Sequence, residues 1–149
     1  MAPRSLDTNI IYLCGQFSHV FHHALTMEFK NQGILVTVEQ FSILALLFYK
    51  SGINQKEVGT LLSRDKTTIA RVISNMEKNK MISRVTDRND SRGRLIYLTN
   101  KGESIQKRAV ELSGKLYLKA IKGIKGSQLK EGLRLMTTMI SNINTISKS

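Results

Sequence analysis

The chain has 149 residues, a formal net charge of +12 and one cysteine, Cys14. This length suits one domain with a substantial core, so we predict a single folding unit over residues 1–149. One cysteine excludes an internal disulfide and a cysteine-rich zinc site. We find neither an apolar run near the roughly 20 residues that span a bilayer nor a secretory leader, so we expect a cytoplasmic protein without membrane contact.

The positive charge is unevenly distributed along the chain. Residues 1–50 are balanced, residues 51–101 hold eleven basic and five acidic side chains, and residues 102–149 hold nine and three. Basic charge that faces a polyanion gives affinity by releasing counterions, whereas the same charge on an outer helix face confers solubility. We assign the excess in 51–101 to nucleic-acid binding and leave the excess in 102–149 unassigned.

Apolar residues at helical spacing predict a long first helix that ends before Gly33. Its stripe comprises Ile10, Leu13, Cys14, Phe17, Val20, Phe21, Ala24 and Leu25. Two capping boxes, Thr37–Gln40 and Asn54–Glu57, then predict a helix that continues through Phe48 and a shorter one after it. The shorter helix should turn three apolar residues inward: Val58, Leu61 and Leu62.

A further helix is predicted over about 65–79, with Asp65 as its N-cap. Four apolar residues share one face: Ile69, Val72, Ile73 and Met76. The opposite face carries no acid and comprises Arg64, Thr67, Arg71, Ser74, Asn75 and Lys78. Most of these side chains can meet phosphates, base edges or thymine methyl groups, so this helix and the one before it form a predicted DNA-binding helix-turn-helix. Lys78 has an alternative role in offsetting the helix dipole.

After Met81 the pattern changes to a two-stranded ribbon, roughly Ile82–Asp87 and Arg94–Leu98, joined by turn-forming residues. Its tip presents three arginines, Arg88, Arg92 and Arg94, which suit an adjacent minor groove. The predicted fold is therefore mainly α with a small β-ribbon. It is a winged helix-turn-helix over about 37–99, with the wing at about 87–94.

Two more helices follow, separated near residues 123–127. The second carries apolar residues at alternating spacings of four and three: Leu129, Leu133, Met136, Ile140 and Ile143. That spacing is typical of a helix-packing seam. We expect the segments at about 5–31 and 100–147 to pack against their copies in a homodimer, with an intramolecular bundle as the alternative.

Four strings, in this order, resemble the signature of the multiple antibiotic resistance regulator (MarR) family. They are Val36–Phe41, Asp65–Arg71, Asp90–Arg92 and Leu98–Glu103. The resemblance extends over about residues 7–147. It implies an obligate dimer of winged helix-turn-helix subunits that binds a pseudo-palindromic operator in double-stranded DNA and usually represses transcription. Release by a small-molecule effector or an oxidant is common in that family.

The same resemblance implies that Thr67, Thr68 and Arg71 read bases, that Arg92 is the wing-tip arginine and that Asp90 braces the wing by ion pairing. Ser91 departs from the pattern, because an arginine is frequent there, and Arg94 replaces some of that charge. The candidate DNA-binding residues of the helix are Arg64, Lys66, Thr67, Thr68, Arg71 and Asn75. Those of the wing are Arg88, Asn89, Ser91, Arg92 and Arg94.

Each candidate sensing residue has a packing role as its alternative. Cys14 resembles the peroxide-sensing cysteine of some members, but tyrosine partners are absent from the second helix, which favours an inert packing thiol. His19 and His23 are one helical turn apart, His22 lies between them, and no carboxylate follows at close spacing. We therefore predict no metal site and no cofactor. Candidate effector liners are Phe17, Phe21, His22 and Phe48, for which hydrophobic core is the alternative.

Two other classes of protein are alternatives to a sequence-specific regulator. No phosphate loop, G-x-S-x-G or H-E-x-x-H motif is present, so we predict that the chain is not an enzyme. A non-specific architectural DNA-binding protein is the second alternative. Thr67, Thr68, Arg71 and Asn75 argue against it, because they supply base-reading chemistry as well as charge.

Overall fold

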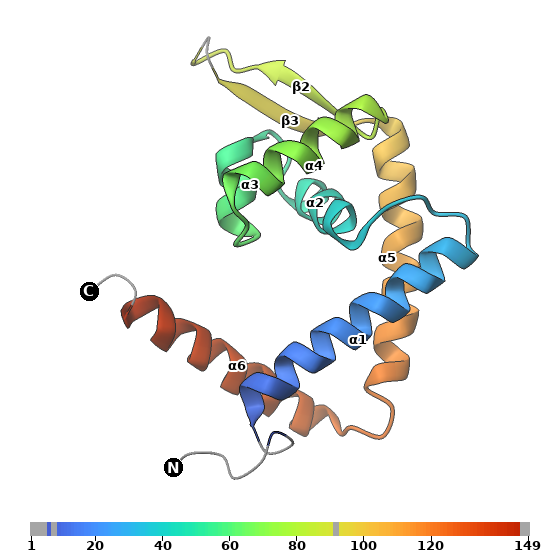
Figure 1. Ribbon diagram of the computed structural model, residues 1–149, viewed down its shortest axis with the longest axis vertical. Helices are drawn as coiled ribbons and strands as arrows, with labels where there is room; N and C mark the ends of the chain where they lie inside the picture. The colour runs from blue at the N-terminus through green and yellow to red at the C-terminus, as the bar shows by residue number, and fades with distance from the viewer. Residues whose placement is uncertain (1–5, 7–8, 91–92, 147–149) are drawn as a thin grey trace. The chain divides into compact units, whose positions relative to one another are not determined.

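The computed structural model describes residue 6 and residues 9–90 and 93–146 (Figure 1). Its elements are α1 (Ile10–Asn31), α2 (Val38–Tyr49), β1 (Ile53–Asn54), α3 (Gln55–Leu61), α4 (Lys66–Lys78), β2 (Ile82–Thr86), β3 (Arg94–Leu98), α5 (Asn100–Ala120) and α6 (Gly126–Ile146). The chain divides into two compact units, residues 1–116 and 117–149. Among the described residues, no helix is both long and apolar enough to cross a membrane.

Local hydrogen bonds set the starts of α2 and α3, as both capping boxes predicted. The Gln40 backbone N–H donates to the Thr37 hydroxyl oxygen at 3.1 Å, and the Thr37 N–H donates to the Gln40 side-chain oxygen at 2.9 Å. Asn54 and Glu57 make the equivalent pair at the start of α3. Each box satisfies two backbone N–H groups that lack partners within the helix.

The ribbon prediction was incomplete, because a third strand joins the sheet. β2 and β3 pair antiparallel from Ile82 opposite Leu98 to Thr86 opposite Arg94. β1 pairs with the other edge of β3, with Ile53 opposite Ile96, so the strand order is β1-β3-β2. Two residues are too few to show the alternation of a strand, so sequence patterning could not reveal β1.

The core of the first unit lies between α1, α2, α4 and the sheet. Its fully buried side chains include Leu25, Phe29, Ile43, Leu44, Leu47, Val58, Ile73, Met76, Ile82 and Ile96. The predicted inner face of α4 is confirmed, because Ile69, Val72, Ile73 and Met76 are all buried. The inward prediction for Leu61 was wrong: this side chain is 48% exposed. Leu62, a full turn after Val58, packs against the core instead.

A tight backbone junction connects α4 to the sheet and to α5. The Thr99 hydroxyl donates to the Lys80 carbonyl oxygen at 2.6 Å and accepts from the Gly102 N–H at 3.1 Å. Gly102 lies so close to Met81 that an added Cβ would overlap the Met81 carbonyl oxygen. Only glycine fits this position without displacing the backbone.

Each unit exposes apolar side chains along a helix. In the first unit, the N-terminal half of α1 exposes Ile10, Ile11, Leu13, Phe17 and Val20. In the second, no residue of α6 is buried, and Leu133, Ile140, Ile143 and Ile146 are each more than half exposed. Large apolar side chains that are exposed repeatedly along one helix are typical of an interaction surface.

Candidate nucleic-acid interface

The turn before α4 and the α4 N-cap orient this helix. Ser63 has a φ of +50°, the left-handed conformation that glycine often supplies in such turns, and the Arg64 N–H donates to the Gly59 carbonyl oxygen at 2.9 Å. The Asp65 carboxylate accepts from the Thr68 hydroxyl at 2.6 Å and from its backbone N–H at 2.8 Å. Both hydrogen bonds favour the charged carboxylate and hold the pKa of Asp65 below its ordinary value.

One face of α4 is open to solvent, because the opposite face is in the core. Lys66, Thr67, Arg71, Asn75 and Lys78 are all exposed. Figure 1 shows α4 running beside the β2–β3 hairpin, which projects beyond the helices of this unit. The exposed face of α4 and the hairpin therefore lie near each other, so one ligand could contact both.

Thr68 and Asn75 are both engaged within the protein. Thr68 is half-buried, and its hydroxyl proton points to Asp65. The Asn75 side-chain oxygen accepts from the Gln40 amide at 2.7 Å and from the Asn79 amide at 3.1 Å. The Gln40 side chain therefore caps α2 through its oxygen and holds α4 through its nitrogen. A glutamate at position 40 would keep the first bond and lose the second.

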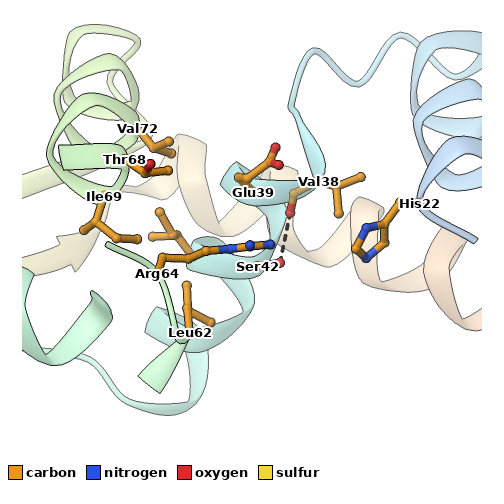
Figure 2. Close-up of a pocket in the computed structure, with 10 residues that line it drawn as sticks. His22, Val38, Glu39, Ser42, Leu62, Arg64, Thr68, Ile69 and Val72 are labelled. Atoms are coloured by element: carbon orange, nitrogen blue, oxygen red, sulfur yellow. Dashed lines mark hydrogen bonds between the residues drawn. The ribbon is translucent and has the colours of Figure 1, made fainter. Parts of the chain in front are cut away.

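Arg64 takes a different direction from the exposed face of α4. Figure 2 shows its side chain extending from the turn toward Ser42, whose hydroxyl donates to the Val38 carbonyl oxygen at 2.9 Å. Arg64 lines a cavity of about 70 Å³ with His22, Val38, Glu39, Ser42, Ile43, Leu62, Thr68, Ile69 and Val72. Of the four predicted effector liners, only His22 lines this cavity.

The wing residues that the structure describes are exposed. Arg88 and Asn89 lie in the turn after β2, and Arg94 opens β3 opposite Thr86. The Asn89 N–H donates to the Asp87 carboxylate at 2.9 Å, and the Gly93 N–H donates to the Asp90 carbonyl oxygen at 2.8 Å. Ser91 and Arg92 lie outside the described residues.

Sequence reasoning missed Arg84, which connects the wing to α4. Its guanidinium lies 3.2 Å from the Glu77 carboxylate and donates to the Ser74 hydroxyl oxygen at 3.1 Å. The available signal was strand alternation, because Arg84 is two residues after the buried Ile82 and shares its side of the strand. The pair neutralises the only carboxylate between Lys66 and Lys78.

The candidate sensing residues of α1 differ in exposure. Cys14 is half-buried, and His19, His22 and His23 are exposed. Over residues 9–90 and 93–146, the structure contains no group of three or more histidine, cysteine or acidic side chains that could hold a metal ion.

A helix-turn-helix followed by a β hairpin defines a winged helix-turn-helix protein, as the sequence predicted. The family model "MarR family" matches residues 36–93. The HTH-type transcriptional regulator MgrA of Staphylococcus aureus is 30% identical over 105 residues, which is 70% of each chain. The chain therefore belongs to the MarR family of transcriptional regulators, as its four sequence strings indicated.

A second curated relative and the solved structures extend this result. The HTH-type transcriptional regulator TtmR of Methylorubrum extorquens is 28% identical over 104 residues, which is 70% of this chain but only 52% of TtmR. The chain thus spans about half the length of that relative. Both curated relatives are named as transcriptional regulators, not as enzymes.

Three solved structures share the fold. The transcriptional regulator SlyA matches with a TM-score of 0.84 and 24% identity over 91% of this chain and 94% of its own. The S. aureus MepR–DNA complex matches with a TM-score of 0.82 and 20% identity over 93% and 99%. CouR of Rhodococcus jostii RHA1 bound to p-coumaroyl-CoA matches with a TM-score of 0.80 and 20% identity over 92% and 95%.

Proposed function

We propose that this chain is a sequence-specific regulator that binds double-stranded DNA as a homodimer, with residues 65–79 in the major groove and residues 87–94 in the minor groove. The observation that carries the proposal is the exposed side of α4, where Thr67 and Arg71 are free of the core and Glu77 is paired with Arg84. Such a surface presents base-reading and phosphate-binding groups without an uncompensated negative charge. MepR, which shares the fold, was solved with DNA.

The candidate residues divide into three roles under this proposal. Thr67 and Arg71 read base edges, because their side chains are exposed on α4 and have the chemistry for it. Lys66 and the wing residues Arg88, Asn89, Ser91, Arg92 and Arg94 bind phosphates and the minor groove, with Asp90 bracing the wing. Thr68 and Asn75 position α4, since Asp65 and Gln40 bind their side chains. Arg64 is exposed but lines the cavity beside Ser42, so we assign it to positioning the turn before α4.

The dimer is proposed from the exposed apolar residues of α1 and α6. A lone subunit would leave large side chains such as Phe17 and Ile140 in water. Burying apolar surface gives about 25 cal/mol per Å², so pairing of these helices with their copies is favourable. We assign residues 5–31 and 100–147 to this contact and residues 37–99 to DNA binding, and a two-fold axis then matches a pseudo-palindromic operator.

We propose that the chain represses transcription and that binding of a small-molecule effector releases it from DNA. The cavity lined by Arg64 joins α1, α2 and the start of α4, so a ligand that enlarges it would move the turn that orients the DNA-reading helix. CouR, which shares the fold, was solved with p-coumaroyl-CoA.

The test is selection from a pool of random duplexes by the purified full chain, followed by footprinting of the selected sequence. We expect a pseudo-palindrome whose half-sites lie roughly 10 base pairs apart. Uniform retention of the pool with no consensus would identify a non-specific architectural protein. Absence of any retained duplex at low salt would reject DNA binding altogether.

A further inference from the structure

A second groove lies entirely within residues 26–108 of the first unit. It has a volume of about 710 Å³ and is formed by the C-terminal end of α1, the loop before α2, the end of α4 and the first turns of α5. None of Thr67, Arg71 and the wing arginines lines it. This volume is within the usual range of small-molecule sites.

Three cations line the groove, and no lining residue is acidic. They are Lys30 of α1 and Lys101 and Arg108 of α5. The Lys101 ammonium donates to the Asn79 carbonyl oxygen at 2.9 Å, and the Arg108 guanidinium donates to the Gln32 carbonyl oxygen at 2.9 Å. These bonds hold both side chains at the groove and leave further N–H donors on each, because an ammonium has three and a guanidinium five.

The remaining walls are amides and apolar side chains. Gln40 is buried and donates to Asn75, which also accepts from Asn79, so these amides form a hydrogen-bonded polar wall. Ile34, Val36 and Met81 are buried beside them. The groove thus combines fixed positive charge with an apolar floor, which suits an anionic molecule with a non-polar portion.

We propose that this groove binds a small molecule that carries at least two negative charges, as phosphate esters and polycarboxylates do. Three cations with no carboxylate among the lining residues repel one another, and a multivalent anion relieves that repulsion more than a single charge does. Arg108 adds a fork of donors that matches a phosphate or carboxylate group. The bound anion would contact α4 at Asn75 and Asn79, beside the helix end that Lys101 holds. Binding here does not require that the chain binds DNA.

The test is isothermal titration of the full chain, without DNA and at constant ionic strength, with pyrophosphate and with citrate as probes. We expect saturable binding of at least one probe and weakening by about tenfold or more in Arg108→Met and in Lys101→Met. The matched control is Lys107→Met, which removes the same charge from the residue next to Arg108 but outside the groove. It should bind like the unmodified chain. Pyrophosphate alone would identify phosphate chemistry, and citrate alone would identify carboxylate chemistry.

Two further measurements test whether the probe binds in this groove and whether the charge of Arg108 matters. Backbone amide shifts on adding the probe should concentrate at Gly33, Leu35 and Met81, which line the groove. Arg108→Lys, which keeps the charge, should retain more affinity than Arg108→Met. Equal weakening in Lys107→Met, shifts spread over the whole surface, or no saturable binding of either probe would overturn the proposal.

Discussion

The guanidinium of Arg84 on β2 lies 3.2 Å from the carboxylate of Glu77 on α4 and 3.1 Å from the Ser74 hydroxyl oxygen. One side chain of β2, the strand that leads into the wing, therefore holds the C-terminal half of α4 and neutralises its carboxylate. The two proposed DNA-binding elements are thereby joined to each other by charge as well as by the core.

Glu77→Gln should strengthen binding to the selected operator and to random duplex by a similar factor. The change releases the positive charge of Arg84 next to the proposed phosphate contacts, and such charge acts without regard to sequence. Titration of labelled duplexes measures the effect. Glu111→Gln on α5 is the control, because Glu111 is also paired with a cation, Lys115 at 2.6 Å. Weaker binding in Glu77→Gln would show that the Arg84 contact matters mainly for the position of α4.

Arg71→Ala should weaken operator binding by about 1–3 kcal/mol and relax the preference at one base position, if Arg71 contacts a guanine. The side chain is exposed on α4 and lies outside the core. Binding is measured on the operator and on its single-base variants. Lys78→Ala, at the end of the same helix, should lower the affinity for all duplexes alike. The same loss on operator and random DNA in Arg71→Ala would rule out base reading by this residue.

Arg94→Gln should reduce the slope of log affinity against log salt by about 1, because each phosphate contact releases counterions. Arg94 is exposed at the start of β3, beside the wing turn. Affinities at several salt concentrations give the slope. Lys130→Gln, at an exposed position of α6 in the second unit, removes the same charge from a residue outside the proposed DNA-binding set and should leave the slope unchanged. An unaltered slope in Arg94→Gln would place this arginine away from the DNA.

Gly102→Ala and Gly114→Ala should change stability in opposite directions, although both lie in α5. A Cβ on Gly102 would overlap the Met81 carbonyl oxygen, so we expect a loss of about 1–3 kcal/mol or more in the free energy of unfolding. Nothing lies within 4 Å of a Cβ on Gly114, and alanine there should gain about 0.5–1 kcal/mol. Urea unfolding measures both. Equal effects would mean that the junction at Met81 adjusts freely.

Asp65→Ala should lower the Tm at neutral pH, because it removes the N-cap of α4. The hydroxyl and the N–H of Thr68 hold the pKa of Asp65 below its ordinary value of 3.8. A lowered pKa stabilises the folded state above pH 3.8, and this contribution is lost as the pH falls through the folded value. The difference in Tm between the two proteins should therefore shrink as the pH falls below 3.8, which melting curves at a series of pH values measure. Asp65→Asn, which keeps an acceptor oxygen, should lie between them at pH 7.

Most helix and strand boundaries could be predicted from the sequence. Thr37 and Gln40 form their capping box within a single turn, and the apolar residues of α4 repeat at the helical period, so neighbours in sequence carry this information. β1 could not be predicted, because two residues acquire a strand conformation only by pairing with β3. The prediction for Leu61 was wrong for a related reason. Which side of the short helix α3 is buried depends on elements that are distant in sequence.

The candidate site divides in the same way. The chain's amino-acid sequence was enough to predict the exposed side of α4 and the cationic hairpin, because helical periodicity and turn-forming residues are local properties. Only the tertiary structure decided that Gln40 binds Asn75, that Arg64 extends toward Ser42 and that Arg84 pairs with Glu77. Gln40 and Asn75 are 35 residues apart along the chain. Packing alone brings such groups within hydrogen-bonding distance, and no local rule states which donor will meet which acceptor.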